Sequence, residues 1–472
     1  MSTVLNSFER YINMENNRNS FSSAFGFVLA SAASAVGLGN IWRFPYLAAK
    51  DGGGVFLLVY IILALTFGFT LLISEVAIGR KTRQSAYTAY GALNKKAGWI
   101  GVIASAIPFI ILPYYALIGG WVLKYFAAFI SGDALASAED GYFTGFITSY
   151  VPPIIFDIIF LGATAFVVYK GVEKGIERVA RILMPALLIL VVGISIFSLT
   201  IEGEGGRTGL EGFAVYIIPN FTGMSFKTFF YIVVDAMGQL FYSISVAMGI
   251  MVTYGSYFKR DSNLVKSVNQ IEFFDTLVAF LAGVMIIPAV FAFLGMEGMQ
   301  NSGPGLMFIA LPKVFAKMGA IGTVVGAVFF LMVLFAALTS SVSVMEAVVS
   351  GCIDRFGWSR NKAVCFEGIA AMVLGIIVCL GYNVFYFEAT LPNGVTAQIL
   401  DIFDYVSNYI LMPVVAIGTC ILVGWVIKPE ALISEITRNG EHFARKNLYI
   451  IMVKYIAPIL LTILLLGAFG VF

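Results

Sequence analysis

Eleven apolar runs of about 20 residues or more constrain this 472-residue chain more than any other feature. At 1.5 Å per residue, a helix of about 20 residues spans the roughly 30 Å hydrocarbon core of a bilayer. The runs lie at 22–46, 54–78, 98–127, 152–170, 178–200, 228–257, 271–296, 320–350, 362–385, 404–427 and 447–470. We therefore expect an all-α polytopic membrane protein with eleven transmembrane helices, as 60% hydrophobic and 12% charged residues also indicate.

The distribution of lysine and arginine predicts the orientation, because these residues favour cytoplasmic loops. The polar residues 1–21 lack the features of a signal peptide, so we expect them to remain as a cytoplasmic amino-terminal segment. With that end inside, most of the 29 lysines and arginines fall in inner loops, and the outer loops hold only Arg207, Lys227, Lys313 and Lys317. We predict a multi-pass protein of the plasma (inner) membrane with an extracellular carboxyl terminus. The net charge of +2 gives no reason to expect a nucleic-acid partner, so we predict none.

Two of the apolar runs contain residues that interrupt helices. The first includes "SAVGLGNIWRFP", in which Gly37, Gly39 and Pro45 accompany the cation Arg43, and the sixth includes "YSISVAMGIMVTYG", with Gly249 near its centre. Non-helical backbone at membrane depth persists only where protein or a water-filled cavity covers it. Close helix packing through small residues is the alternative, and for the sixth run alone it explains the pattern equally well.

Interruptions in the first and sixth runs are typical of transporters built from two inverted repeats of five helices. The repeats would cover about 22–200 and 228–427, and the run at about 447–470 would be an extra span. The two halves show no convincing similarity residue by residue, so this prediction depends on the positions of the breaks. We expect one transmembrane transporter domain over 22–470, with unwound spans 1 and 6.

The chemistry available near the breaks suits ions and zwitterions better than catalysis. Unwound helices free carbonyl oxygens for Na⁺ and expose helix amino termini to carboxylates. Hard oxygen donors surround the breaks: Ser34, Asn40, Ser243, Ser245, Asp275, Thr339, Ser340, Ser341 and Ser343. The one histidine, His442, lies in an inner loop, and the four cysteines have no metal-site spacing. We therefore expect no catalytic residues and no enzyme activity.

These stretches together resemble the neurotransmitter:sodium symporter family, the sodium- and neurotransmitter-type solute carriers, and in particular its bacterial amino-acid branch with eleven spans. The resemblance covers about residues 18 to 470 and is most specific in "GLGNIWRFPYLAAKDGGGVF", with "ISEVAIGR" following it in the second span. The stretches "GQLFYSISVAMG", "TYGSY", "FAALTSSVSVME" and "LDIFDY" support it.

The resemblance implies two co-transported Na⁺ ions. The first would bind the carbonyl of Ala35, the side chains of Asn40, Ser243 and Asp275, and the substrate carboxylate. Because that carboxylate is shared, sodium and substrate should each raise the affinity of the other. The second ion would bind the carbonyls of Ala33, Val36 and Ala336 and the hydroxyls of Thr339 and Ser340.

The resemblance also implies a substrate pocket and two gates. The expected substrate-binding residues are Ala35, Gly37, Leu38, Gly39, Ile111, Tyr115, Tyr242, Ser243, Ser245, Met248, Ser340 and Val344. The outer gate would consist of Arg43 and Asp404, and the inner gate of Arg18, Asp354, Tyr257 and Glu346, with Phe21 beside them. Glu75 matches an acidic position that supports the broken sixth span. Without the resemblance, tyrosines such as Tyr115 are more often packing or interface residues.

Departures from the family pattern lead to further predictions. The favoured alignment places Ala279 where many members bind chloride through a serine, and Asp275 where asparagine is usual. We therefore expect chloride-independent transport, in which Asp275 supplies the negative charge. An alignment of the seventh span shifted by one residue is the alternative, because Pro288 would fit it. Gly175 and Pro185 match a helix-unwinding pattern, or are simply a loop glycine and a membrane proline.

The predicted function is sodium-coupled symport of a neutral amino acid by alternating access. Met248 and Val344 indicate a roomy and adaptable pocket, so we favour a hydrophobic or aromatic substrate. The expected partners are the amino acid, Na⁺ and the lipid bilayer, while the sequence leaves the oligomeric state open. A transporter-like amino-acid sensor without net transport is the alternative.

Overall fold

The long apolar runs form the longest helices of the computed structural model, which describes residues 20–298 and 303–471. Within these residues, nine helical stretches are long and apolar enough to cross a membrane, and the bent pair Ala24–Ala35 and Gly39–Lys50 would make a tenth. The nine are Gly54–Thr82, Lys95–Ser131, Pro152–Tyr169, Val172–Leu199, Leu264–Gly295, Ala320–Phe356, Arg360–Leu380, Ile399–Val426 and Lys446–Ala468. Each overlaps one of the predicted spans.

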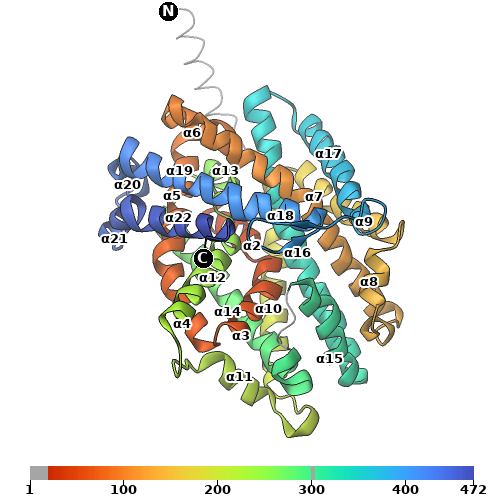
Figure 1. The fold of residues 1–472 in the computed structure, drawn as a ribbon. Coiled ribbons are helices and arrows are strands. Elements are labelled where there is room, and N and C mark those ends of the chain that lie inside the picture. Colours follow the sequence, from red (N-terminus) through yellow and green to blue (C-terminus); the bar gives the residue numbers. More distant parts are fainter. Residues whose placement is uncertain (1–19, 299–302, 472) are drawn as a thin grey trace, which may run out of the picture.

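The first half of the chain is entirely helical apart from its connections (Figure 1). Its helices are α2 (Ala24–Ala35), η1 (Gly39–Arg43), α3 (Phe44–Lys50), α4 (Gly54–Leu63), η2 (Ala64–Gly68), α5 (Phe69–Thr82), α6 (Ala86–Leu93), η3 (Lys95–Ala97), α7 (Gly98–Ser131), η4 (Ala136–Ala138), α8 (Tyr142–Ile147), α9 (Pro152–Tyr169), η5 (Val172–Glu177) and α10 (Arg178–Leu199). Several adjoining pieces, such as α4, η2 and α5, form one continuous helical stretch.

The second half adds further helices and one short hairpin. The helices are η6 (Glu204–Gly206), α11 (Gly209–Ile217), α12 (Phe226–Ser243), α13 (Ile250–Tyr257), α14 (Leu264–Gly298), η7 (Leu306–Ala310), α15 (Leu311–Lys317), α16 (Ala320–Phe356), α17 (Arg360–Leu380), α18 (Ile399–Asp404), η8 (Tyr405–Leu411), α19 (Met412–Ile421), η9 (Leu422–Val426), α20 (Pro429–Ile436), α21 (Lys446–Ile451), η10 (Met452–Ile456) and α22 (Ala457–Ala468). Strands β1 (Ala389–Thr390) and β2 (Thr396–Ala397) pair in antiparallel fashion.

Both predicted helix breaks are present. Helix α2 ends at Ala35, Val36 is extended, and the helix that resumes at Gly39 is bent by 52° from α2. In the sixth span, α12 ends at Ser243 and α13 begins at Ile250. Between them Ser245, Ala247 and Gly249 have φ values of 54°, 61° and 75°. Positive φ is costly for residues other than glycine, so the surrounding structure must hold this backbone in place.

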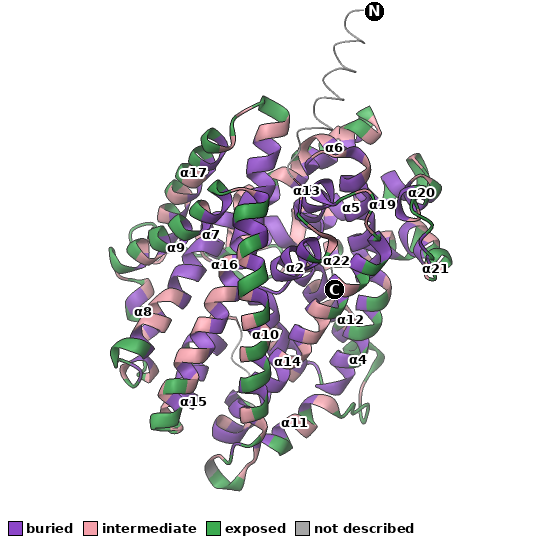
Figure 2. Ribbon diagram, turned by 180° about the vertical axis from the view of Figure 1, so that it is seen from behind, coloured by how far each residue is buried: buried purple, intermediate pink, exposed green. Residues whose placement is uncertain are grey.

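The outermost helices expose apolar side chains, as expected for a protein surrounded by lipid. In α10, Ile182, Ile189 and Ile196 are 62%, 71% and 61% exposed, and their seven-residue spacing places them on one face. Figure 2 shows such exposed residues along α10 and α17, while buried residues dominate α2, α5 and α13. An apolar exposed surface of this extent is unfavourable in water and favourable in a bilayer.

The broken helices lie in the interior of the bundle. Helix α2 packs against α10, α14 and α16, and α13 packs against α5 and α16. Helix α7 packs along α16, which brings the third and eighth predicted spans beside the breaks. Backbone at the two breaks is therefore covered by protein, as helix interruptions at membrane depth require.

Candidate transport site

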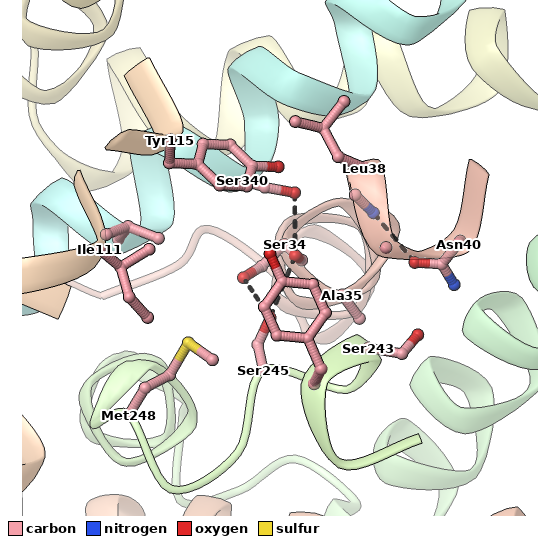
Figure 3. A pocket seen from close by; sticks show the side chains of 14 residues that line it. Ser34, Ala35, Leu38, Asn40, Ile111, Tyr115, Ser243, Ser245, Met248 and Ser340 are labelled. Atoms are coloured by element: carbon pink, nitrogen blue, oxygen red, sulfur yellow. Dashed lines mark hydrogen bonds between the residues drawn. The ribbon is translucent and has the colours of Figure 1, made fainter. Parts of the chain in front are cut away.

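A cavity lies where the two helix breaks meet α7 and α16 (Figure 3). The space between its lining residues that holds no protein atoms, including the part open to solvent, is about 390 Å³. It is lined by Ser34, Ala35, Gly37, Leu38, Gly39, Asn40, Ile111, Tyr115, Tyr242, Ser243, Ser245, Met248, Ser340 and Val344. All twelve predicted substrate-binding residues are in this lining, which Ser34 and Asn40 complete.

Serine hydroxyls connect the two breaks to α16. Ser245 and Ser340 both donate to the backbone oxygen of Ser34, each over 3.1 Å. The hydroxyls of Ser34 and Ser343 are 2.6 Å apart. Figure 3 shows Ser34, Ser245 and Ser340 near the centre of the cavity. The freed backbone of the first span is thereby held by side chains from the sixth and eighth spans, which is the requirement for stable non-helical backbone in a membrane.

The cavity has one apolar end and one polar end. Figure 3 shows Ile111 and Met248 on one side and Asn40 and Ser243 on the other. The hydroxyl of Tyr115 is buried and has no hydrogen-bond partner among the described residues. A buried hydroxyl without a partner is unfavourable, so a ligand oxygen placed at Tyr115 would satisfy it.

Glycine is required at Gly37 and Gly39 because side chains from other helices approach their backbone closely. A Cβ atom at Gly37 would be 2.8 Å from the Ser340 hydroxyl oxygen and 3.1 Å from that of Tyr115. A Cβ atom at Gly39 would be 2.7 Å from the nearest ring carbon of Tyr242. These glycines leave the backbone accessible to whatever occupies the cavity.

The side chains predicted for the first sodium site lie together. Asn40 and Ser243 donate to Asp275 Oδ1 over 2.8 Å and 2.7 Å. Asp275 is fully buried in α14, and its second oxygen, Oδ2, has no hydrogen-bond partner among the described residues. A buried carboxylate oxygen of this kind needs a proton or a cation, so the donor set fits Na⁺.

The groups predicted for the second sodium site lie at the contact between α2 and α16. Ser340 Oγ is 3.4 Å from the Val36 carbonyl oxygen, and Thr339 Oγ1 is 3.1 Å from that of Ala336. Ala33 is buried at the end of α2. These donors are carbonyl and hydroxyl oxygens, and among the described residues no cluster of histidine, cysteine, aspartate or glutamate could hold a metal ion. Neutral oxygens suit a monovalent hard cation.

The two residues of the predicted outer gate are held by different partners. Arg43 donates to the Tyr409 hydroxyl over 3.3 Å, and its guanidinium carbon is 5.8 Å from the centre of the Tyr242 ring. Asp404 accepts hydrogen bonds from Tyr114 over 3.3 Å and from Asn408. Tyr242 and Arg43 also line a second cavity of about 850 Å³, so Tyr242 lies between the two cavities.

Three residues of the predicted inner gate make separate polar contacts. Tyr257 donates to Glu346 over 2.6 Å, and Asp354 accepts from the Ser85 backbone over 2.6 Å. Phe21 packs edge-on against the Tyr257 ring. Arg18 lies outside the described residues.

The structure adds several polar contacts that sequence reasoning did not identify. Arg360 binds Glu346 through two hydrogen bonds of 2.7 and 2.9 Å. Gln239 donates to the Gly39 carbonyl over 3.0 Å. Glu177 accepts from the backbone and hydroxyl of Ser22 over 2.8 and 2.5 Å. Gln239 belongs to the stretch "GQLFYSISVAMG", so its position next to the break could have indicated this contact. The contacts of Arg360 and Glu177 depend on how the helices pack and have no local sequence signal.

Glu75 contacts the backbone of the sixth-span break. Its Oε1 atom accepts a hydrogen bond of 2.6 Å from the backbone of Ala247, a residue with positive φ in the sixth-span break. The segment proposed to unwind near Gly175 is helical in this structure, since η5 leads directly into α10. The unwinding therefore stays a prediction.

Comparisons with known proteins identify the family to which this chain belongs. The family model described as "Sodium:neurotransmitter symporter family" matches residues 18–139 and 154–471. A transporter of Bacillus subtilis, described as uncharacterised and sodium-dependent, is 34% identical over 462 residues, covering 96% of this chain and 98% of its own. A sodium-dependent transporter of Methanocaldococcus jannaschii is 33% identical, covering 90% of this chain and 85% of its own.

A solved structure has the same fold. The crystal structure of MhsT in complex with L-phenylalanine matches with a TM-score of 0.84 and 34% identity, covering 96% of this chain and 100% of that one. The match thus covers nearly the whole of this chain. The chain belongs to the sodium:neurotransmitter symporter family: it is a multi-pass sodium-dependent transporter and not an enzyme.

Proposed function

We propose that the protein is a sodium-coupled symporter that takes up a neutral amino acid with a hydrophobic or aromatic side chain, by alternating access and without chloride. The observation that carries this proposal is the cavity at the helix breaks, with its polar end at Asn40 and Ser243 and its apolar end at Ile111 and Met248. A zwitterion with an apolar side chain matches that division. The L-phenylalanine in the MhsT structure supports an aromatic substrate.

The substrate carboxylate would meet the backbone at Gly37–Gly39 and the Tyr115 hydroxyl. The helical stretch that begins at Gly39 presents its amino-terminal end there, and helix amino termini stabilise negative charge. The ammonium group would meet the carbonyls freed between Tyr242 and Ser245. The side chain would contact Ile111, Tyr242, Met248, Ser340 and Val344.

Coupling would come from the first sodium ion. Bound beside Asp275 with the Ala35 carbonyl, Asn40 and Ser243, it would also contact the substrate carboxylate. One shared bond makes sodium and substrate raise each other's affinity, because the coupling free energy is reciprocal. The second ion, at the α2–α16 contact, would hold these helices together and favour the outward-facing state.

Independence from chloride would follow from the negative charge of Asp275. Ala279 lies one helical turn further along α14, is fully buried and carries no hydroxyl group. A fixed carboxylate beside Na⁺ does electrostatically what a bound chloride ion would do.

Alternating access requires gates on both sides of the cavity. Arg43 and Asp404 would close the outer side, and Arg18, Asp354, Tyr257 and Glu346 the inner side. The helices α12 and α13, taken as one broken span, would bring the number of spans to eleven. Ten of these spans would form two inverted repeats, and the eleventh would be an extra helix. The amino terminus would be cytoplasmic and the carboxyl terminus extracellular.

Uptake into proteoliposomes tests the proposal. Each of the twenty amino acids is offered with an inward sodium gradient, with potassium in place of sodium, and with gluconate in place of chloride. We expect sodium-driven accumulation of a hydrophobic or aromatic amino acid that is unchanged in gluconate. Sodium-dependent binding without accumulation would instead favour the sensor.

A further inference from the structure

A groove lies between the beginning of α14 and the segment that joins α20 to α21. About 980 Å³ of open space is bounded by Asn263, Val265, Lys266, Asn269, Gln270, Phe273, Phe274 and His442. None of these residues is acidic. Lys266 is exposed, and its ammonium group forms no ion pair within the described part of the chain. The groove therefore offers a positive charge and several amide groups to a ligand.

The polarity of the groove changes along one face of α14. Residues 263, 266, 270, 273 and 274 recur at helical spacing, so they share that face. The polar residues come first, and Phe273, which is 59% exposed, follows. At 1.5 Å per residue, Lys266 and Phe273 are about 10 Å apart along the helix. A ligand with a charged head and an apolar tail matches this order.

The opposite wall of the groove is held firmly in place. Arg445 binds Glu272 through hydrogen bonds of 2.9 and 3.2 Å, and its guanidinium carbon is 3.4 Å from the centre of the Phe69 ring. Asn439 donates to the Arg260 carbonyl over 2.8 Å. These contacts fix the segment that carries His442, and they neutralise Glu272, the acidic side chain nearest the groove on α14.

We propose that this groove binds one anionic phospholipid, with its phosphate at Lys266 and His442 and an acyl chain along Phe273 and Phe274. The inference rests on the proposed orientation, which places the beginning of α14 in the inner leaflet. Basic grooves at the cytoplasmic surface attract anionic headgroups, at about 1 kcal/mol per lysine. A free phosphate would use only the charged end, whereas a lipid uses the whole polarity gradient.

Native mass spectrometry of the purified protein tests this, because it counts bound lipids without requiring transport. The protein in detergent is titrated with dioleoylphosphatidylglycerol, with dioleoylphosphatidylcholine, and with glycerol 3-phosphate as the free headgroup. We expect the first phosphatidylglycerol to bind more tightly than phosphatidylcholine and to resist displacement by glycerol 3-phosphate. Displacement by equimolar glycerol 3-phosphate would overturn the lipid assignment.

Four variants localise the binding. Lys266→Gln should weaken the first phosphatidylglycerol about fivefold, whereas Lys266→Arg should retain it. Phe273→Ala should weaken both lipids alike, because acyl contacts do not distinguish headgroups. Lys96→Gln, a matched loss of charge at another exposed lysine, should change nothing.

Equal phosphatidylglycerol affinity in Lys266→Gln and the wild type would overturn the proposal. If Lys266→Gln does not fold, the other two variants decide. Loss of the preference for phosphatidylglycerol in Lys266→Arg would count against the groove. Unchanged lipid binding in Phe273→Ala would also count against it. Sodium-driven uptake is measured separately in vesicles with and without phosphatidylglycerol. A failure of lipid binding is thereby distinguished from a failure of symport.

Discussion

Asn40 and Asp275 are joined by a hydrogen bond of 2.8 Å, although 235 residues separate them in the chain. Ser243 donates to the same carboxylate oxygen over 2.7 Å, so the first and sixth spans are both tied to α14 where they break. The other oxygen of Asp275 is left for a further partner. One side chain thus connects the two broken helices and supplies the negative charge beside the proposed sodium ion.

Asp275→Asn should make transport respond to chloride. The substitution keeps the shape of the side chain and removes its charge, so sodium should bind more weakly when no other anion is present. We expect uptake in gluconate to fall roughly tenfold, equivalent to about 1.4 kcal/mol. Uptake is measured in proteoliposomes with chloride or gluconate. Glu272→Gln, on the same helix but paired with Arg445, is the control and should remain independent of chloride. Normal uptake by Asp275→Asn in gluconate would contradict the charge argument.

Glu75→Ala should destabilise the break in the sixth span. It removes the acceptor for the buried N–H of Ala247, and an unsatisfied buried donor costs about 1–3 kcal/mol. We expect a lower Tm and weaker sodium-dependent binding of the amino acid that the uptake assay selects. Glu75→Gln keeps an acceptor oxygen and should recover most of both. Equal Tm values for the alanine and glutamine variants would show that the hydrogen bond contributes nothing.

Gly37→Ala should weaken substrate binding while leaving the fold intact. The added methyl group would be 2.8 Å from the Ser340 hydroxyl oxygen, where the substrate carboxylate is proposed to approach. Equilibrium binding of the radiolabelled amino acid that the uptake assay selects should weaken at least about tenfold, a loss of about 1.4 kcal/mol. Gly193→Ala, in α10 with open space around its Cβ position, should bind normally. If Gly37→Ala binds the amino acid with wild-type affinity, Gly37 does not belong to the substrate site.

The positions of the two helix breaks could be predicted from the sequence, for physical reasons. Glycine, proline and clustered serines are local signals of interrupted helices, and the family motifs assign them to the first, sixth and eighth spans. The lining of the cavity therefore matches the predicted substrate residues, with Ser34 and Asn40 in addition.

Side-chain pairing was harder to predict, because it depends on how helices rotate against one another. Arg43 contacts Tyr409, and Arg360 contacts Glu346, although no local pattern links these residues. The sixth span shows a second limit: its helices α12 and α13 are separated by 244–249, so no single helix there has the length of a complete span. Long-range geometry, rather than local sequence pattern, determines both features.

Glu177→Gln should loosen the beginning of α2 from α10. Glu177 is buried and accepts from Ser22 twice and from Arg181 over 2.6 Å, and an amide cannot accept all three in the same way. We expect faster hydrogen exchange over 176–184, with a larger increase when potassium replaces sodium, because the second sodium ion would also restrain α2. Exchange mass spectrometry measures this. Glu173→Gln, an exposed carboxylate in the same turn, is the control. Identical exchange in both variants would contradict a role for Glu177.

Asp51→Asn should flatten the dependence of stability on pH. Asp51 lies between α3 and α4, where burial and the nearby carboxylate of Asp235 raise its pKa to about 7, against the opposing charge of Lys50. Since the pKa is higher in the folded protein than its usual 3.8, the contribution of Asp51 to stability is complete below pH 4 and is lost as pH rises through 7. The variant stays neutral and should therefore match the wild type in Tm near pH 4 and exceed it at pH 8.

Asp140→Asn provides a comparison of opposite sign for the Asp51 experiment. The exposed carboxylate of Asp140 accepts a 2.5 Å hydrogen bond from Lys313, which lowers its pKa, so its contribution to stability is present above pH 4 and is lost as pH falls. That contribution should be small, because solvent screens exposed pairs. Thermal unfolding of the wild type and both variants between pH 4 and pH 8 measures the two effects together. A Tm for Asp51→Asn that stays equal to the wild type at pH 8 would show that the Asp51 carboxyl group ionises there without penalty, which its burial beside Asp235 does not allow.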